Sequence, residues 1–101
     1  MVKGKTKSGI KFQIDERIKD DARFLFYLNK LNKCTAEDIQ ELSGYVMGMI
    51  ELIFGSGEGT ITFMDAVAEK HDGVCNVKTM FAEITEMLEA TKLKNSSPSP
   101  K

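Results

Sequence analysis

The stretch from Tyr45 to Phe54 is hydrophobic at every position except Gly48 and Glu51. If this stretch is helical, each residue is turned by about 100° from the last, so the side chains point in nearly every direction. A helix that is apolar on all sides must be enclosed by other elements or must bind a partner. At 101 residues, the chain has the size of one domain with one modest core. The stretch therefore requires neighbouring helices that surround it, or a binding surface.

Apolar residues at helical spacing predict helices over about 15–32, 36–54, 61–71 and 77–94. A residue suited to capping precedes or opens each helix: Asp20 and Asp21, Thr35, Thr60, and Asn76. The side chains expected to face the core include Phe24, Leu28, Leu31, Ile39, Leu42, Val46, Met49, Ile50, Ile53, Ile61, Met64, Val67, Met80, Ile84, Met87 and Leu88.

Polar and apolar residues alternate over residues 2–14 around a Ser8-Gly9 pair, which predicts a β-hairpin within residues 1–14. Ile10, Phe12 and Ile14 would share its buried face. Residues 95–101, NSSPSPK, are poor in apolar side chains and are expected to be disordered. The predicted fold is mainly α: one small four-helix domain over residues 1–94, with a short N-terminal β-hairpin and a disordered C-terminal tail.

Glycines are concentrated between the second and third predicted helices, at Gly55, Gly57 and Gly59. A phosphate-binding loop would need a lysine after the last glycine, and a dinucleotide-binding loop would need a preceding strand. Neither is present, so these glycines are interpreted as a helix end and a joint. Gly44 and Gly48 lie inside the second helix, where glycine is costly, and they predict a close approach of another helix.

Residues that carry catalysis or bind metals are sparse. His71 is the only histidine, and the two cysteines, Cys34 and Cys75, match neither a metal site nor a disulfide framework. Each cysteine precedes a predicted helix start, where it can pack against the first turn. No nucleophile lies beside a base in any recognisable pattern. We therefore expect no enzyme activity, no cofactor and no metal.

Charge is distributed unevenly along the chain. Residues 1–33 hold nine basic and four acidic side chains, whereas residues 34–91 hold two basic and eleven acidic ones. The basic segment is compatible with nucleic-acid binding, with contact to the acidic body of a second copy, or with a simply solvated terminus. No apolar run reaches the ~18 residues that span a bilayer, and no secretory signal is visible. We expect a cytosolic protein without membrane contact.

Three segments follow one another along the chain: SGIKFQIDERIKDDARF, MIELIFG and HDGVCNVKTMFAEITEMLEATKLKNS. Together they resemble the small tail assembly chaperones of long-tailed phages and prophages of Gram-positive bacteria. SGIKFQIDERIKDDARF is similar to the opening hairpin and acidic helix start of that family, and MIELIFG to its leucine-rich helix ending in glycine. HDGVCNVKTMFAEITEMLEATKLKNS is similar to its closing Asp-Gly turn and capped helix. The resemblance covers nearly the whole chain and depends on the order and spacing of the three segments.

The resemblance implies a protein that coats the helical, aggregation-prone tape measure protein before the tail tube forms around it. Such chaperones act in the host cytoplasm and are expected to be absent from the mature virion. Many are also made in a longer, frameshifted form that recruits the tail tube protein. Two other functions stay open from the residues. One is a small nucleic-acid-binding regulator that uses the lysine-rich N-terminus, although the acidic body would repel the phosphates of a nucleic acid. The other is a structural ring subunit of the tail or of head completion.

Apolar positions are the candidates for contact with such a client. All of the candidates but Met49, which also falls on the core-facing stripe of the second helix, lie outside the main helical stripes. Methionines favour this function because their flexible side chains adapt to varied partners. Many copies on one client, helped by self-association, would add weak contacts into avidity. The client-binding residues predicted on this basis are Met47, Met49, Leu52, Phe54 and Phe63.

Overall fold

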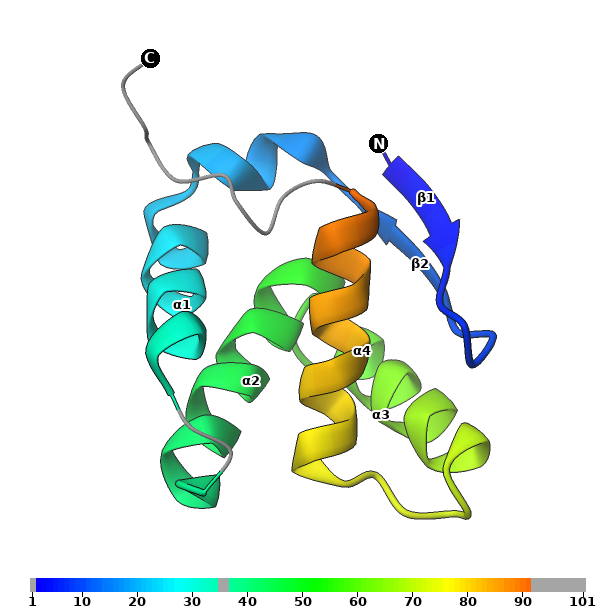
Figure 1. Ribbon diagram of the computed structural model, residues 1–101. Coiled ribbons are helices and arrows are strands. Elements are labelled where there is room, and N and C mark those ends of the chain that lie inside the picture. The colour runs from blue at the N-terminus through cyan, green and yellow to red at the C-terminus, as the bar shows by residue number, and fades with distance from the viewer. Residues whose placement is uncertain (1, 35–36, 92–101) are drawn as a thin grey trace.

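The computed structural model describes residues 2–34 and 37–91, which form a hairpin followed by four α-helices (Figure 1). The elements are β1 (Val2–Lys5), β2 (Lys11–Ile14), the short 3-10 helix η1 (Glu16–Asp20), α1 (Ala22–Lys33), α2 (Ile39–Phe54), α3 (Glu58–Lys70) and α4 (Val77–Ala90). The predicted mainly α fold is confirmed. The last helix, predicted to reach about residue 94, ends at Ala90, with Thr91 as its C-cap. Residues 92–94 and the predicted tail 95–101 lie outside the described residues.

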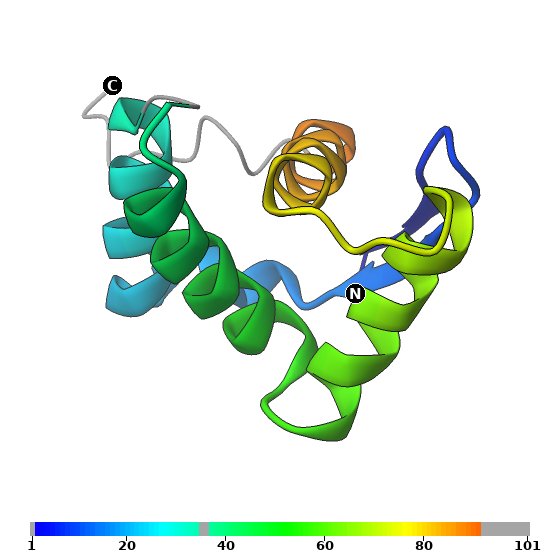
Figure 2. The ribbon, with the colours of Figure 1, turned by 90° about the horizontal axis from the view of Figure 1, so that it is seen from below.

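Helix α2 is the centre of the domain. Helices α1, α3 and α4 each pack against it. Figure 2 shows α1 beside α2, α4 across α2 from α1, and α3 leading away from the end of α2. This arrangement encloses the apolar stretch, because each flank of α2 faces a different neighbour. Four of its side chains are buried and five more are half-buried against the core: Leu42, Val46, Met49 and Ile50, then Tyr45, Met47, Leu52, Ile53 and Phe54. The all-round apolar helix is thus mostly covered by its own domain.

The predicted first helix, 15–32, is two elements in the structure. The carboxylate of Asp15 accepts from the backbone N–H of Arg17 and begins η1, and Asp21 accepts from Arg23 N–H and begins α1. Asp21 has an extended backbone, with ψ of 126°, so the chain changes direction there. The cap at Asp21 was predicted correctly, whereas a single helix across Asp20 and Asp21 was wrong because a capping residue cannot continue a preceding helix.

Helix α3 begins earlier than predicted. Its first residue is Glu58, and its N-cap Gly57 provides no side-chain hydrogen bond. Thr60 is therefore not the cap; it is buried in the first turn, and its Oγ1 donates to the carbonyl of Gly55 at 2.7 Å. The buried face of α3 contains Thr60, Phe63 and Val67, so Ile61, which was expected inside, is 54% exposed.

Helix α2 also begins differently. Its N-cap is Asp38, whose Oδ1 accepts from Glu41 N–H at 3.3 Å, and the predicted cap Thr35 lies outside the described residues. Ile39 is then the first helical residue, and it is 41% exposed. The prediction that Ile39 faces the core is wrong. At α4, by contrast, Asn76 caps by accepting from Lys78 N–H, as predicted.

The hairpin pairs Val2 with Ile14 and Lys5 with Lys11 in an antiparallel register. The side chains of Ile10, Phe12 and Ile14 are buried, which confirms the predicted face. Strand β1 lies against α4. Because a two-stranded sheet is marginal alone, this packing gives the hairpin its stability.

Candidate functional site

An apolar groove lies between α1 and α4, which flank α2 in Figure 1. Its volume is about 320 Å³. The deeper side chains are buried and apolar, while Phe81 and Thr85 are half-buried at its side. Its lining consists of Leu28, Leu31, Asn32, Cys34, Phe81, Ile84, Thr85 and Leu88. Such a groove between two helices can take the apolar side chains of a third helix.

The five predicted client-binding residues do not form one surface. Met49 is fully buried in the core and Phe63 is 3% exposed, so neither side chain is accessible at the surface of the folded domain. Met47, Leu52 and Phe54 are half-buried. The rings of Phe54 and Phe63 stack at 4.7 Å between centroids, which holds the end of α2 on α3.

The cause of this outcome differs between the two buried residues. Met49 belongs to the same helical stripe as Val46 and Ile50, which the central position of α2 buries. Phe63 is buried because α3 is turned so that Phe63, rather than Ile61, meets the core. A periodic pattern predicts that one stripe of a helix is buried. Where the helix carries apolar residues on two faces, the pattern does not decide which of these faces turns toward the core.

An aromatic cluster in which only Phe26 is exposed lies on α1 and α2. The ring of Phe26 is 52% exposed and makes edge-to-face contacts with Tyr27 at 5.4 Å and with Tyr45 at 6.3 Å. Lys30 Nζ lies 5.6 Å from the Phe26 ring centroid and 5.9 Å from that of Tyr45. The Phe26-Tyr27 pair was visible in the sequence as apolar residues off the inner face, but its meeting with Tyr45 depends on helix packing.

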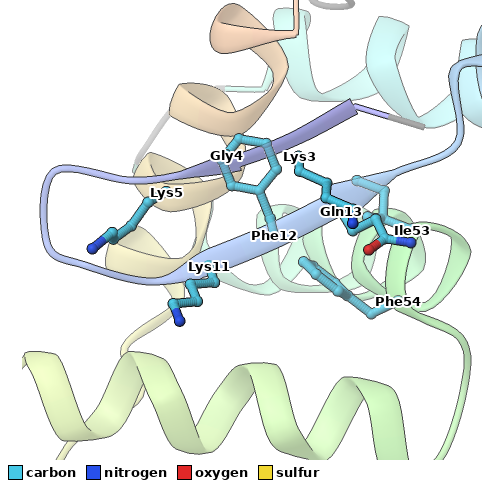
Figure 3. Close-up of a pocket in the computed structure, with 8 residues that line it drawn as sticks. All are labelled: Lys3, Gly4, Lys5, Lys11, Phe12, Gln13, Ile53 and Phe54. Atoms are coloured by element: carbon cyan, nitrogen blue, oxygen red, sulfur yellow. The ribbon is translucent and has the colours of Figure 1, made fainter.

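A second groove, of about 690 Å³, lies beside the hairpin (Figure 3). Phe12 and Phe54 provide its apolar part, and the flexible side chains of lysines from both strands surround it. Gly4 faces Phe12 across the strands, and a Cβ at Gly4 would overlap the Phe12 ring. The full lining is Lys3, Gly4, Lys5, Lys11, Phe12, Gln13, Ile53 and Phe54.

A buried carboxylate joins the hairpin to α3 and α4. Glu83 is 6% exposed, and its Oε2 accepts from Ser8 Oγ at 2.5 Å. His71 Nε2 lies 3.1 Å from the same oxygen. Thr6, also buried, places its Oγ1 3.1 Å from Ser8 Oγ and accepts from Ile10 N–H. Sequence reasoning missed this cluster, although Glu83 lies within the apolar stripe of α4, where a charged residue is unusual.

The electrostatics of Glu83 favour its charged form. Burial raises the pKa of the Glu83 carboxyl, but hydrogen bonds with Ser8, Thr6 and His71 outweigh burial and hold the pKa below its ordinary value of 4.5. An ionised carboxylate only accepts, so His71 carries the proton on Nε2. The other carboxylate oxygen, Oε1, is buried without a hydrogen-bond partner among the described residues.

The order of contacts in this cluster suits a structural role. In a serine nucleophile triad, the histidine lies between the hydroxyl and the carboxylate and removes the hydroxyl proton. Here the carboxylate of Glu83 lies between Ser8 and His71, and Ser8 donates its proton to it. The histidine is therefore not positioned to activate Ser8, and the cluster ties three segments together.

Neither cysteine favours the reactive thiolate. Burial, followed by the nearby charges of Glu41 and Asp38, raises the pKa of the Cys34 thiol. Burial and Asp65 raise the pKa of Cys75 in the same way. Because the thiolate is the nucleophile and the metal-binding form, both side chains behave as small apolar residues.

Within residues 2–34 and 37–91, no helix combines the length and hydrophobicity needed to cross a membrane. Across those same ranges, no group of three or more His, Cys, Asp or Glu side chains could hold a metal ion. No family model, curated protein or solved structure matched the chain.

Proposed function

We propose that this protein is a non-catalytic chaperone for an apolar helical client, acting as a phage tail assembly chaperone on the tape measure protein. The observation that carries the proposal is the groove between α1 and α4. The order of sequence segments that resembles that chaperone family supports the choice of client. Long amphipathic helices of a tape measure protein present apolar stripes that would aggregate before the tail tube encloses them.

The binding mode follows from the shape and lining of the groove. Leu28 and Leu31 of α1 lie opposite Ile84 and Leu88 of α4, so an entering side chain meets apolar surface on both sides. A client helix would lay its apolar face along the groove at residues spaced three and four apart. One such groove buries little area, and many copies along a client would supply the affinity.

Phe81 gives the sharpest test of this site, because it lines the groove and is only half-buried. We would co-express the chain with the tape measure protein of the same genome and measure client solubility and co-elution. Phe81→Gln should release the client while leaving the helical signal in circular dichroism unchanged. The matched control is Phe26→Gln, the same substitution at an exposed site on the outer side of α1.

The outcomes separate the possible functions. If Phe81→Gln loses the client and Phe26→Gln keeps it, the groove is the client site. If only Phe26→Gln loses the client, the chaperone function holds but the aromatic cluster replaces the groove as its site. If the unmodified chain neither binds nor solubilises the client, the chaperone proposal is wrong. A closed ring formed without any client would then indicate a structural subunit.

A further inference from the structure

The outer edge of strand β2 lies along the hairpin groove at Lys11. Thr6 N–H donates to Ile10 carbonyl, and hydrogen-bonded pairs alternate along an antiparallel ladder. Gly4 and Phe12 therefore exchange backbone hydrogen bonds, while the main-chain N–H and C=O of Lys11 turn away from β1. Figure 3 shows Phe54 on the side of β2 away from β1, where these groups point.

The two faces of the hairpin differ in chemistry at this edge. Side chains alternate along a strand, so Lys11 lies on the solvent face and Phe12 on the inner face. Lys3 and Lys5 of β1 are exposed as well, and across the described residues none of the three lysines forms an ion pair. On the inner side, Phe54 of α2 continues the apolar surface of Phe12.

We propose that the β2 edge binds an extended acidic segment of a partner protein, which adds a third strand to the hairpin. In an extended segment with alternating acidic and apolar residues, the acidic side chains would meet the lysines. The apolar side chains would meet Phe54, which is half-buried and so more accessible than Phe12. Strand β2 is four residues long, so the recognised segment is short. This site is separate from the groove between α1 and α4 and does not depend on the chaperone function.

Two features favour a peptide over a nucleic acid. An open strand edge matches the repeating donors and acceptors of a peptide backbone, which a nucleic acid lacks. Single-stranded nucleic acid instead needs aromatic rings on which its bases can stack, and Phe12 is 6% exposed. Lysines on an edge strand also discourage that strand from pairing with the same strand of a second copy. Such a protective function needs no apolar groove beside the lysines, so the groove favours a binding site.

The probe is the peptide acetyl-Glu-Val-Glu-Phe-Glu-Val-amide, titrated into the ¹⁵N-labelled full chain. We expect saturable amide shifts centred on β2. At saturation, hydrogen exchange of the Lys11 amide should slow by about tenfold or more, because that N–H gains an acceptor. The Phe12 amide, already bonded to β1, should change little. The same peptide with lysines in place of glutamates should not bind.

Two substitutions separate the contribution of the Lys11 charge to peptide binding from that of its backbone N–H. Lys11→Gln should weaken peptide binding by about two- to fivefold, the range of an exposed ion pair. Lys11→Pro also removes the outward N–H, at an edge position where proline is tolerated, and should weaken binding further. If Lys11→Pro does not fold, exchange of the Lys11 amide in the unmodified chain decides the question.

Three results would overturn the proposal: unchanged exchange at Lys11 in the presence of peptide, equal binding of the basic peptide, or tighter binding of a ten-nucleotide oligothymidine. The last result would assign the groove to nucleic acid. Its affinity would then fall steeply with salt.

Discussion

Ser8 Oγ donates a 2.5 Å hydrogen bond to Glu83 Oε2 and so joins the hairpin turn to the middle of α4. The two residues are 75 positions apart in the sequence. Beside this bond, Lys7 N–H donates to Glu86 Oε2, one turn further along the same helix. The turn is therefore anchored by two carboxylates of one helix, one buried and one on the surface.

Ser8→Ala should lower the free energy of unfolding by about 1–3 kcal/mol. The substitution leaves the buried Glu83 carboxylate with one donor fewer, and a charged group deprived of a partner is costly. Ser56→Ala, at an exposed position in the loop between α2 and α3, is the matched control and should change stability by less than about 0.5 kcal/mol. Urea denaturation of both variants measures this, and equal midpoints would contradict an anchoring role for Ser8.

Stability should fall as the pH is lowered below about 4.5. The pKa of Glu83 is below its ordinary 4.5 in the fold, so its contribution is complete above pH 4.5 and is lost as pH falls through the folded pKa. Hydrogen bonds from Arg17 and Arg23 lower the pKa of Asp15 and Asp21 to about 2, and these act in the same direction.

Glu83→Gln removes the contribution of the buried Glu83 carboxyl to the pH dependence of the unfolding free energy. Its unfolding free energy should change less between pH 5 and pH 2 than that of the unmodified chain, with Asp15 and Asp21 supplying the remaining slope. Denaturation at a series of pH values measures the difference. Identical slopes would show that the Glu83 carboxyl titrates alike in the folded and unfolded states, which would contradict its lowered pKa.

The two glycines inside α2 should respond to alanine in different ways. A Cβ at Gly44 meets nothing within 4 Å, so Gly44→Ala should raise stability by about 1 kcal/mol through helix propensity. A Cβ at Gly48 would overlap the ring of Tyr27 from α1, so this change should be about 1–3 kcal/mol less favourable than Gly44→Ala. Thermal unfolding of both variants compares them directly, and equal shifts would contradict a close approach at Gly48.

Met47→Ala and Met49→Ala should differ in how much they lower the stability measured by thermal unfolding. Met49 is fully buried, and Met49→Ala should cost about 2–5 kcal/mol by leaving a cavity. Met47 is half-buried, so Met47→Ala should cost distinctly less. Both variants can then be assayed for client solubilisation under conditions where they remain folded. Specific loss of the client in Met47→Ala would add α2 to the binding surface.

Several local features were predictable because their causes lie within a few residues. Asp21 and Asn76 cap helices because their short side chains accept from the next turn, and Gly55 ends α2 at a φ of 85° that favours glycine. Alternation over Ile10, Phe12 and Ile14 fixed the buried face of the hairpin. Periodicity predicted the four helices for the same reason.

The sequence by itself determined the helices, the hairpin and some of their ends, because short-range hydrogen bonding and side-chain spacing decide these. Only the tertiary structure decided that α3 turns Phe63 inward and Ile61 outward, and that Met49 is unavailable to a partner. It also brought Glu83 to Ser8 and placed Phe54 beside β2. These outcomes depend on how whole helices rotate and pack against each other, and a pattern within one segment carries no information about the segments it will meet.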